Sequence, residues 1–99
     1  MDHNKVQKAL GLAKGSNKLI YGYRLFSAFA TMKLRLVIIA HDMGPSQKEK
    51  LINQCLHYKV PYDATNFSRE ELAHATGMKT LVAVGVEDEN IYQLIKKYF

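Results

Sequence analysis

The stretch Leu34-Arg35-Leu36-Val37-Ile38-Ile39-Ala40 decides the fold. Its nearly unbroken apolar run is typical of a central strand that is buried on both faces of a sheet. A second buried strand is predicted at Thr80-Leu81-Val82-Ala83-Val84-Gly85-Val86. Two shorter runs, Leu19-Ile20-Tyr21 and Val60 to Asp63, are expected to complete the sheet. The sequence therefore predicts four strands, with Leu19–Tyr21 as an exposed edge.

Between these strands, apolar residues recur at the spacing of an amphipathic helix. Helices are expected over residues 3–13 and in segments opening at Gly22, Ser46, Ser68 and Asp88. This alternation predicts an α/β fold, a three-layer α-β-α sandwich with a four-stranded mixed sheet, formed by residues 1–99 as a single domain.

Caps and apolar stripes refine the helix predictions. Capping-box patterns start helices at Ser46-Gln47-Lys48-Glu49 and at Ser68-Arg69-Glu70-Glu71, the second of which is expected to end at Gly77. The residues expected on buried helix faces are Leu25, Phe26, Phe29 and Met32 in the second helix and Leu51, Ile52, Cys55 and Leu56 in the third.

Positive charge is concentrated in the first third of the chain. The basic residues there are Lys5, Lys8, Lys14, Lys18, Arg24, Lys33 and Arg35, and the one acidic residue is Asp2. Residues 1–35 thus carry a net +6, whereas the rest of the chain sums to −1. Such asymmetry favours a polyphosphate partner, RNA or DNA, over a basic surface that only keeps the protein soluble.

Several functional classes find no support in the sequence. No apolar run is long enough to span a bilayer, and the N-terminal residues lack the apolar segment of a signal peptide. Cys55 is the single cysteine, which fits a reducing cytoplasm, and the four histidines lack metal-ligand spacing. We therefore expect a cytoplasmic protein with no membrane partner, metal, cofactor or small-molecule substrate, and no enzymatic activity.

Two short segments lie where a ligand could approach the chain. Gly22 separates an expected strand from a helix, so a partner can come close to the backbone, and Arg24 in the first helical turn can meet a phosphate or be a simple surface arginine. His41-Asp42 follows the central strand, where α/β sheets often bind ligands, or forms a polar turn there.

The whole chain resembles the kink-turn RNA-binding ribosomal proteins of the seven-Ae and thirty-e superfamily, and most closely its YlxQ-type bacterial members. The matching stretches are Leu10-Gly11-Leu12-Ala13, Gly22-Tyr23-Arg24, Leu36-Val37-Ile38-Ile39-Ala40-His41-Asp42, Val60-Pro61, Glu71-Leu72-Ala73 with Gly77, and Leu81-Val82-Ala83-Val84. The resemblance implies a ribosome-associated protein that binds a kinked or internally looped RNA.

The resemblance also assigns roles to residues. Gly22 and Tyr23 would allow close approach of RNA, Arg24 would contact base edges or phosphate, and His41 and Asp42 would lie beside the RNA. Met78 to Leu81, with Lys79 and Thr80, match a loop that packs against a bulged nucleotide. Lys14, Lys18, Arg24, Lys33 and Arg35 would neutralise phosphates.

One position departs from the family pattern. Leu25 stands where seven-Ae proteins have a glutamate that accepts hydrogen bonds from guanine, so this readout is absent. The alternative function is a protein-interaction or ribosome-assembly module with weak or no kink-turn binding. Glu87-Asp88-Glu89 and the aromatic pair Tyr98-Phe99 would then contact the protein partner.

Overall fold

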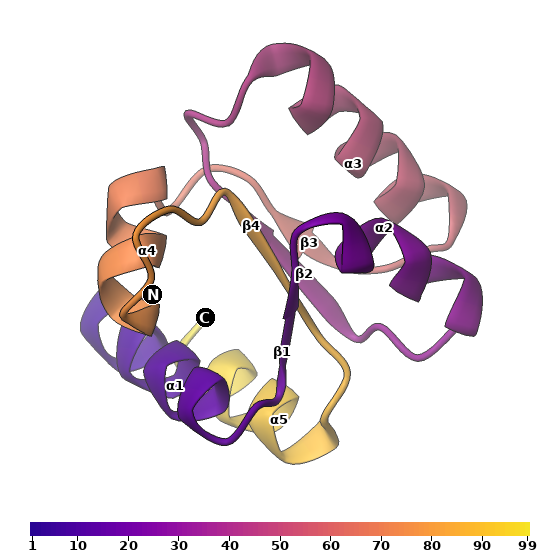
Figure 1. Ribbon diagram of the computed structural model, residues 1–99. Coiled ribbons are helices and arrows are strands. Elements are labelled where there is room, and N and C mark those ends of the chain that lie inside the picture. The colour runs from indigo at the N-terminus through magenta and orange to yellow at the C-terminus, as the bar shows by residue number, and fades with distance from the viewer.

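The computed structural model describes all residues, 1–99 (Figure 1). Its elements, in chain order, are α1 (His3–Gly15), β1 (Leu19–Tyr21), α2 (Tyr23–Ala28), the 3-10 helix η1 (Phe29–Thr31), β2 (Leu36–Ile39), α3 (Pro45–His57), β3 (Tyr62–Asp63), α4 (Arg69–Thr76), β4 (Ala83–Val86) and α5 (Glu89–Tyr98). This order confirms the predicted alternation of helices and strands.

The four strands form one mixed sheet in the order β1-β4-β2-β3. Strand β4 runs antiparallel to both β1 and β2, whereas β2 and β3 are parallel. Strand β1 is an edge strand, as predicted, and β3 is the other edge. The two central strands are shorter than predicted. At their ends, the Arg35 N–H donates a hydrogen bond to the Val86 carbonyl and the Ala40 N–H donates one to the Val82 carbonyl.

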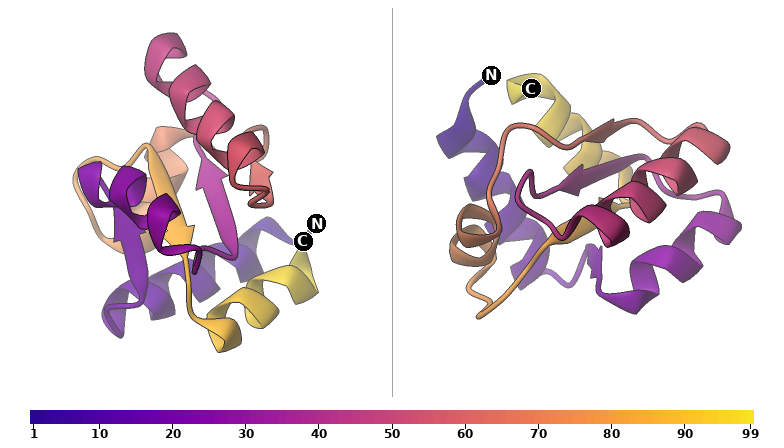
Figure 2. Two further views of the ribbon diagram at one scale, coloured as in Figure 1. Left: turned by 90° about the vertical axis from the view of Figure 1, so that its right-hand side faces the viewer. Right: turned by 90° about the horizontal axis from the view of Figure 1, so that it is seen from above.

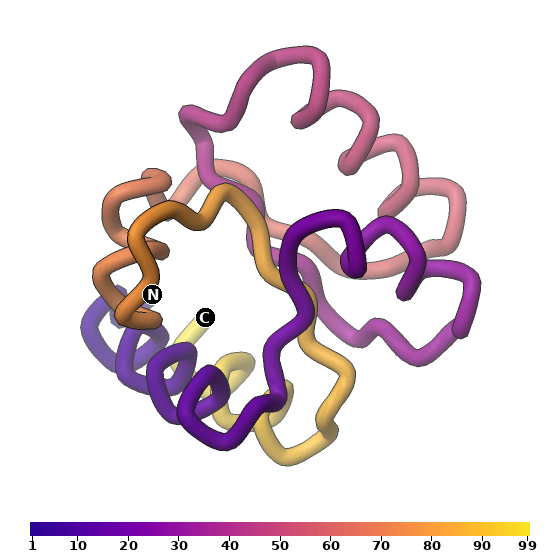
Figure 3. The backbone as a smooth tube through the Cα atoms, in the orientation of Figure 1, coloured from indigo at the N-terminus to yellow at the C-terminus, as the bar shows by residue number.

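Helices cover both faces of the sheet, which confirms the three-layer sandwich. Helices α1, α4 and α5 lie on one side, and α2 and α3 lie on the other (Figures 1 and 2). The two ends of the described chain lie close together (Figure 3), and the Asp2 N–H donates a 2.9 Å hydrogen bond to the Tyr98 carbonyl. This bond links α1 to α5.

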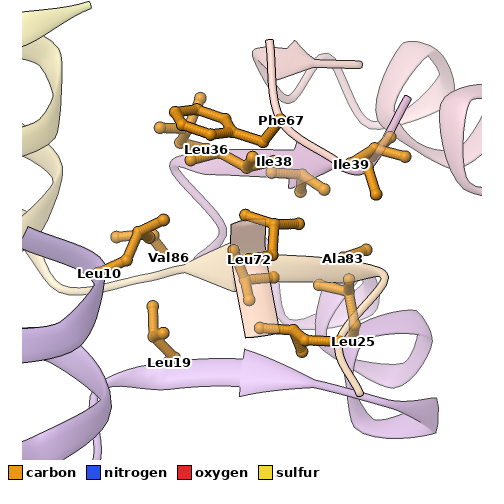
Figure 4. Packing of buried hydrophobic residues seen from close by; sticks show 14 of the residues in the cluster. Leu10, Leu19, Leu25, Leu36, Ile38, Ile39, Phe67, Leu72, Ala83 and Val86 are labelled. Carbon is orange, nitrogen blue, oxygen red and sulfur yellow. The ribbon is translucent and has the colours of Figure 1, made fainter. Parts of the chain in front are cut away.

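Apolar side chains from all layers meet at the sheet (Figure 4). Every residue of β2 and β4 is buried, as expected for central strands. Helix α2 lies very close to β4: a Cβ added at Gly85 would stand 2.5 Å from Leu25 Cδ1 and 2.9 Å from Leu34 Cδ2. Glycine at this position lets Leu25 pack directly on the sheet.

The predicted buried faces of α2 and α3 are only partly correct. Leu25 and Phe29 are buried, but Phe26 and Met32 are exposed, with Met32 at 74%. Met32 is exposed because α2 ends at Ala28, the chain tightens into η1, and Met32 then adopts a left-handed conformation with φ 61°. In α3, Leu51 and Cys55 are buried and Ile52 is half-buried, whereas Leu56 lies on the exposed side.

Two of the predicted helix caps are present in the structure, and one is not. Ser68 and Glu71 form the predicted capping box of α4, and Asp88 caps α5 by accepting a hydrogen bond from the Ile91 N–H. The capping box predicted at Ser46 is wrong, because α3 begins one residue earlier, at Pro45. Proline suits the first helical position, since that position needs no N–H donor.

This difference predicts unequal effects for two serine substitutions. Ser68→Ala removes the acceptor for the Glu71 N–H and should lower the free energy of unfolding by about 1 kcal/mol. Ser46→Ala, inside the exposed first turn of α3, should change it by less than about 0.5 kcal/mol. Urea unfolding followed by circular dichroism compares the two variants, and equal losses would contradict the assignment of the caps.

Candidate nucleic-acid interface

Three chain segments meet at one end of the sheet, which we call the Gly22 end: Gly22-Tyr23 after β1, His41-Asp42 after β2, and residues 79–82 before β4 (Figure 1). They meet because Tyr21 pairs with Val84 and Ile39 pairs with Ala83 in adjacent strands. The structure thus brings together most of the residues that the sequence selected.

Gly22 forms an open turn between β1 and α2. Its φ of 67° and ψ of −153° fall in a region that is essentially restricted to glycine. A Cβ at this position would have no atom within 4 Å, so the turn requires glycine for its backbone angles and not for packing space. The next side chain, Tyr23, is 84% exposed. The turn therefore presents accessible backbone beside an uncovered aromatic ring.

The loop before β4 presents a different apolar residue from the one that the sequence indicated. Leu81 is only 5% exposed and belongs to the core, whereas Val82 is 36% exposed. Lys79 and Thr80 are exposed, as their proposed role requires. The fully apolar run gave no alternation from which the exposed residue could be selected.

Asp42 ties the Gly22 end to the start of α4. One carboxylate oxygen accepts a 2.8 Å hydrogen bond from the Arg69 N–H, and the other lies 3.7 Å from Arg69 Nε. An open hollow of about 490 Å³ extends from here between α4 and the loop before β4, and Lys79 and His74 also line it. Sequence reasoning missed Arg69 and His74, because only the fold places α4 beside this loop.

The exposed residue His41 is held through its backbone. Its N–H donates a 2.8 Å hydrogen bond to the Phe67 carbonyl, and its own carbonyl accepts a 3.0 Å hydrogen bond from Lys48 Nζ. The imidazole makes no hydrogen bond with the rest of the chain. The side chain is therefore available to a partner at the Gly22 end.

Several of the cations proposed to bind phosphate lie at the opposite end of the strands. Lys18 pairs with Asp88 at 3.1 Å, and Arg35 pairs with Glu89 at 2.7 Å. Lys33 is exposed and shares a hollow with Glu87. The register explains this, because Leu19 and Leu36 both stand opposite Val86, just before the acidic residues 87–89. The positive charge of residues 1–35 is therefore partly neutralised by this acidic segment.

Two other cations lie along the β1 edge. Lys14 Nζ stands 5.8 Å from the centre of the Tyr21 ring. Arg24, in the first turn of α2, lines a hollow of about 380 Å³ together with Lys18, Glu87 and Asp88. Arg24 is exposed and forms no ion pair, so its guanidinium is free to meet a phosphate or a base edge.

The pKa values of two carboxyl groups are lowered by hydrogen bonds. The Arg69 N–H lowers the pKa of Asp42, and the Ile91 N–H together with Lys18 lowers the pKa of Asp88, both from an ordinary value of 3.8. A lowered pKa in the folded state means that these groups stabilise the fold above about pH 4. That contribution disappears as the pH falls through the lowered values.

We therefore expect urea stability to be level from about pH 5 to 7 and to fall below pH 4. The variant carrying Asp42→Asn and Asp88→Asn should lose less stability on acidification than the wild type, because its amides do not titrate. Urea midpoints at pH 6 and pH 3 measure the difference. An equal acid loss in the two proteins would show that these carboxylates do not contribute to it.

Three further observations concern the thiol, metal ligands and helix length. Cys55 is buried, and its burial raises the pKa of the thiol to about 11, so the thiol stays protonated and unreactive. No group of three or more His, Cys, Asp or Glu side chains is placed to hold a metal ion. None of the helices combines the length and the apolar character needed to cross a membrane.

Comparison with known proteins gives the family. The family described as "Ribosomal protein L7Ae/L30e/S12e/Gadd45 family" matches residues 4–95. A solved structure of a Bacillus halodurans protein of unknown function is 29% identical, with a TM-score of 0.85 and 94% of each chain covered. No curated protein matches the chain. The chain belongs to the ribosomal protein L7Ae/L30e/S12e/Gadd45 family, and this membership supports an RNA-binding, ribosome-related role.

Proposed function

We propose that this protein is a non-catalytic, cytoplasmic RNA-binding protein that recognises a kinked or internally looped RNA, such as a kink-turn, at the Gly22 end. The observation that carries the proposal is the Gly22 turn itself. It combines a glycine-only conformation with an exposed aromatic ring at the end of the sheet. Family membership supplies RNA as the class of partner. Within the family, the resemblance of its sequence to YlxQ-type bacterial members supports the proposal that it belongs to that group.

The chemistry of the Gly22 end suits irregular RNA. Unpaired or sheared bases expose edges and ring faces that a regular A-form duplex hides. The turn at Gly22 lets such a base approach the backbone, and Tyr23 offers a ring for stacking. Val82 adds an apolar contact from the facing loop. Recognition would therefore rely on shape and stacking, and it does not need a glutamate at position 25.

Phosphate contacts would supply most of the affinity. Lys79 lies at the Gly22 end, and Arg24 follows Gly22 in the first turn of α2, beside a hollow that Glu87 and Asp88 also line. Lys14 lies along the β1 edge, whereas Lys33 shares a hollow with Glu87 at the opposite end of the strands. Lys18 and Arg35 would contribute less, because each must first leave its carboxylate partner.

The dependence of affinity on salt tests this electrostatic part. If about four cations contact phosphates, the logarithm of the association constant should fall with the logarithm of salt concentration at a slope near −3. Fluorescence anisotropy with a labelled structured RNA at several potassium chloride concentrations gives the slope. A slope near zero would contradict phosphate-driven binding.

A further inference from the structure

A second basic and aromatic surface lies at the C-terminal turn of α5, which we call the α5 surface. Its centre is a groove of about 230 Å³, lined mainly by Pro61, Tyr62, Tyr92, Lys96 and Phe99. Tyr62 begins β3, the edge strand opposite β1. Three inter-strand spacings, about 14 Å, separate these two edges. The α5 surface is therefore distinct from the Gly22 end.

The groove offers apolar and aromatic walls that the chain leaves uncovered. Tyr62 is 38% exposed and Phe99 is 41% exposed, whereas Tyr92 is partly buried against the core. Exposed aromatic rings can stack on the flat face of another ring. Nucleic-acid bases have such a face, and stacking on it tolerates any base sequence.

Three lysines surround the aromatic residues. Lys96 Nζ stands 5.7 Å from the centre of the Tyr92 ring, while Lys5 and Lys97 stand 4.8 Å and 5.6 Å from the centre of the Tyr98 ring. None of these lysines forms an ion pair. Tyr92 and Lys96 line the groove, and Tyr98 directly precedes Phe99, which also lines it. The charges of the three ammonium groups are free for an anionic partner.

The nearby carboxylates are already engaged within the chain. Asp63, which also lines the groove, accepts hydrogen bonds from Thr65 and from the side chain and N–H of Asn66. Asp2 accepts a hydrogen bond from the Lys5 N–H at the start of α1. The lysines therefore keep a positive excess over these two acids, and the charge of the surface complements an anion.

We infer that the α5 surface binds an unpaired stretch of RNA, with one base in the groove and the flanking phosphates on Lys5, Lys96 and Lys97. The identification of RNA rests on the proposed function. Both halves of a nucleotide are matched here, the base by the rings and the phosphate by the lysines. An acidic peptide would match the lysines but would have no base to stack on the rings.

Binding of a labelled ten-nucleotide oligouridine, measured by fluorescence anisotropy, tests this inference. Lys96→Glu combined with Lys97→Glu should weaken binding at least tenfold, and Phe99→Ala should weaken it roughly tenfold. The control combines Lys8→Glu with Lys50→Glu, which makes the same change of charge on exposed residues of α1 and α3, and it should bind much more tightly than the α5 variant. In the wild type, backbone amide signals of Tyr92, Lys96 and Phe99 should shift when oligouridine is added. Circular dichroism confirms that each variant is folded.

The outcomes separate this inference from the proposed function. Oligouridine binding by the α5 variant tests this inference, whereas the binding of structured RNA by the Arg24→Glu variant tests the proposed function. If the α5 variant binds oligouridine as tightly as the wild type, the inference is wrong, whatever happens at the Gly22 end. It is equally wrong if a ten-residue polyglutamate peptide displaces oligouridine at equal concentration, since the surface would then select acidic peptides.

Discussion

Leu25→Glu is expected to unfold the protein and not to create a contact with RNA. Leu25 is 1% exposed and packs against Gly85 and Leu34 on the sheet. A carboxylate at this position would be buried without a partner, at an effective cost of several kcal/mol. Domains of this size are stable by only about 5–15 kcal/mol. Circular dichroism and urea unfolding should therefore show a largely unfolded or strongly destabilised chain.

Leu25→Met provides the matched control for this substitution. It keeps the volume and apolar character of the side chain, so it should cost less than about 1.5 kcal/mol and leave RNA binding unchanged. A folded Leu25→Glu variant with a new preference for kinked RNA would contradict this prediction. It would mean that position 25 can face the RNA and that α2 is not anchored through this residue.

Arg24→Glu is expected to weaken binding to structured RNA about 10- to 100-fold. The substitution removes a charged contact and introduces repulsion with phosphate, and a charged hydrogen bond alone contributes roughly 1.5–3 kcal/mol. Arg24 is exposed and unpaired, so the fold should tolerate the change. Anisotropy titration at fixed salt measures the loss, and the thermal unfolding midpoint should move by only a few degrees.

Arg35→Glu is the control with the same change of charge. Arg35 is paired with Glu89 at the opposite end of the strands. Its long-range effect on a partner at the Gly22 end is screened at physiological salt. We therefore expect a loss of about threefold or less. Equal losses for the two variants would show that overall charge, and not the Gly22 end, determines binding.

The sequence predicted the order of the elements, because the signals for that order are local. Continuous apolar runs identified β2 and β4, and caps at Ser68 and Asp88 identified the starts of α4 and α5. The exposure of Met32 and the start of α3 at Pro45 depend on how the chain leaves one element and enters the next. Helical periodicity contains no information on such transitions.

The candidate site was predictable where one residue determines the geometry. Gly22 stands between a strand and a helix, and its observed backbone angles fit almost no other residue. The distribution of charge over the surface was not predictable, because the composition gives the number of charged residues and not their positions in the fold. Strand register brings Lys18 and Arg35 to acidic residues that follow β4, more than fifty residues later in the chain.

Titration of the wild-type protein into two RNAs at fixed moderate salt tests the central claim most directly. One RNA contains a standard kink-turn, and the other has the tandem G·A pairs of that motif replaced by Watson–Crick pairs. Recognition at the Gly22 end predicts clearly tighter binding to the kinked RNA. Equal binding to both would contradict shape recognition, and binding to neither would favour a protein-interaction module on the same fold.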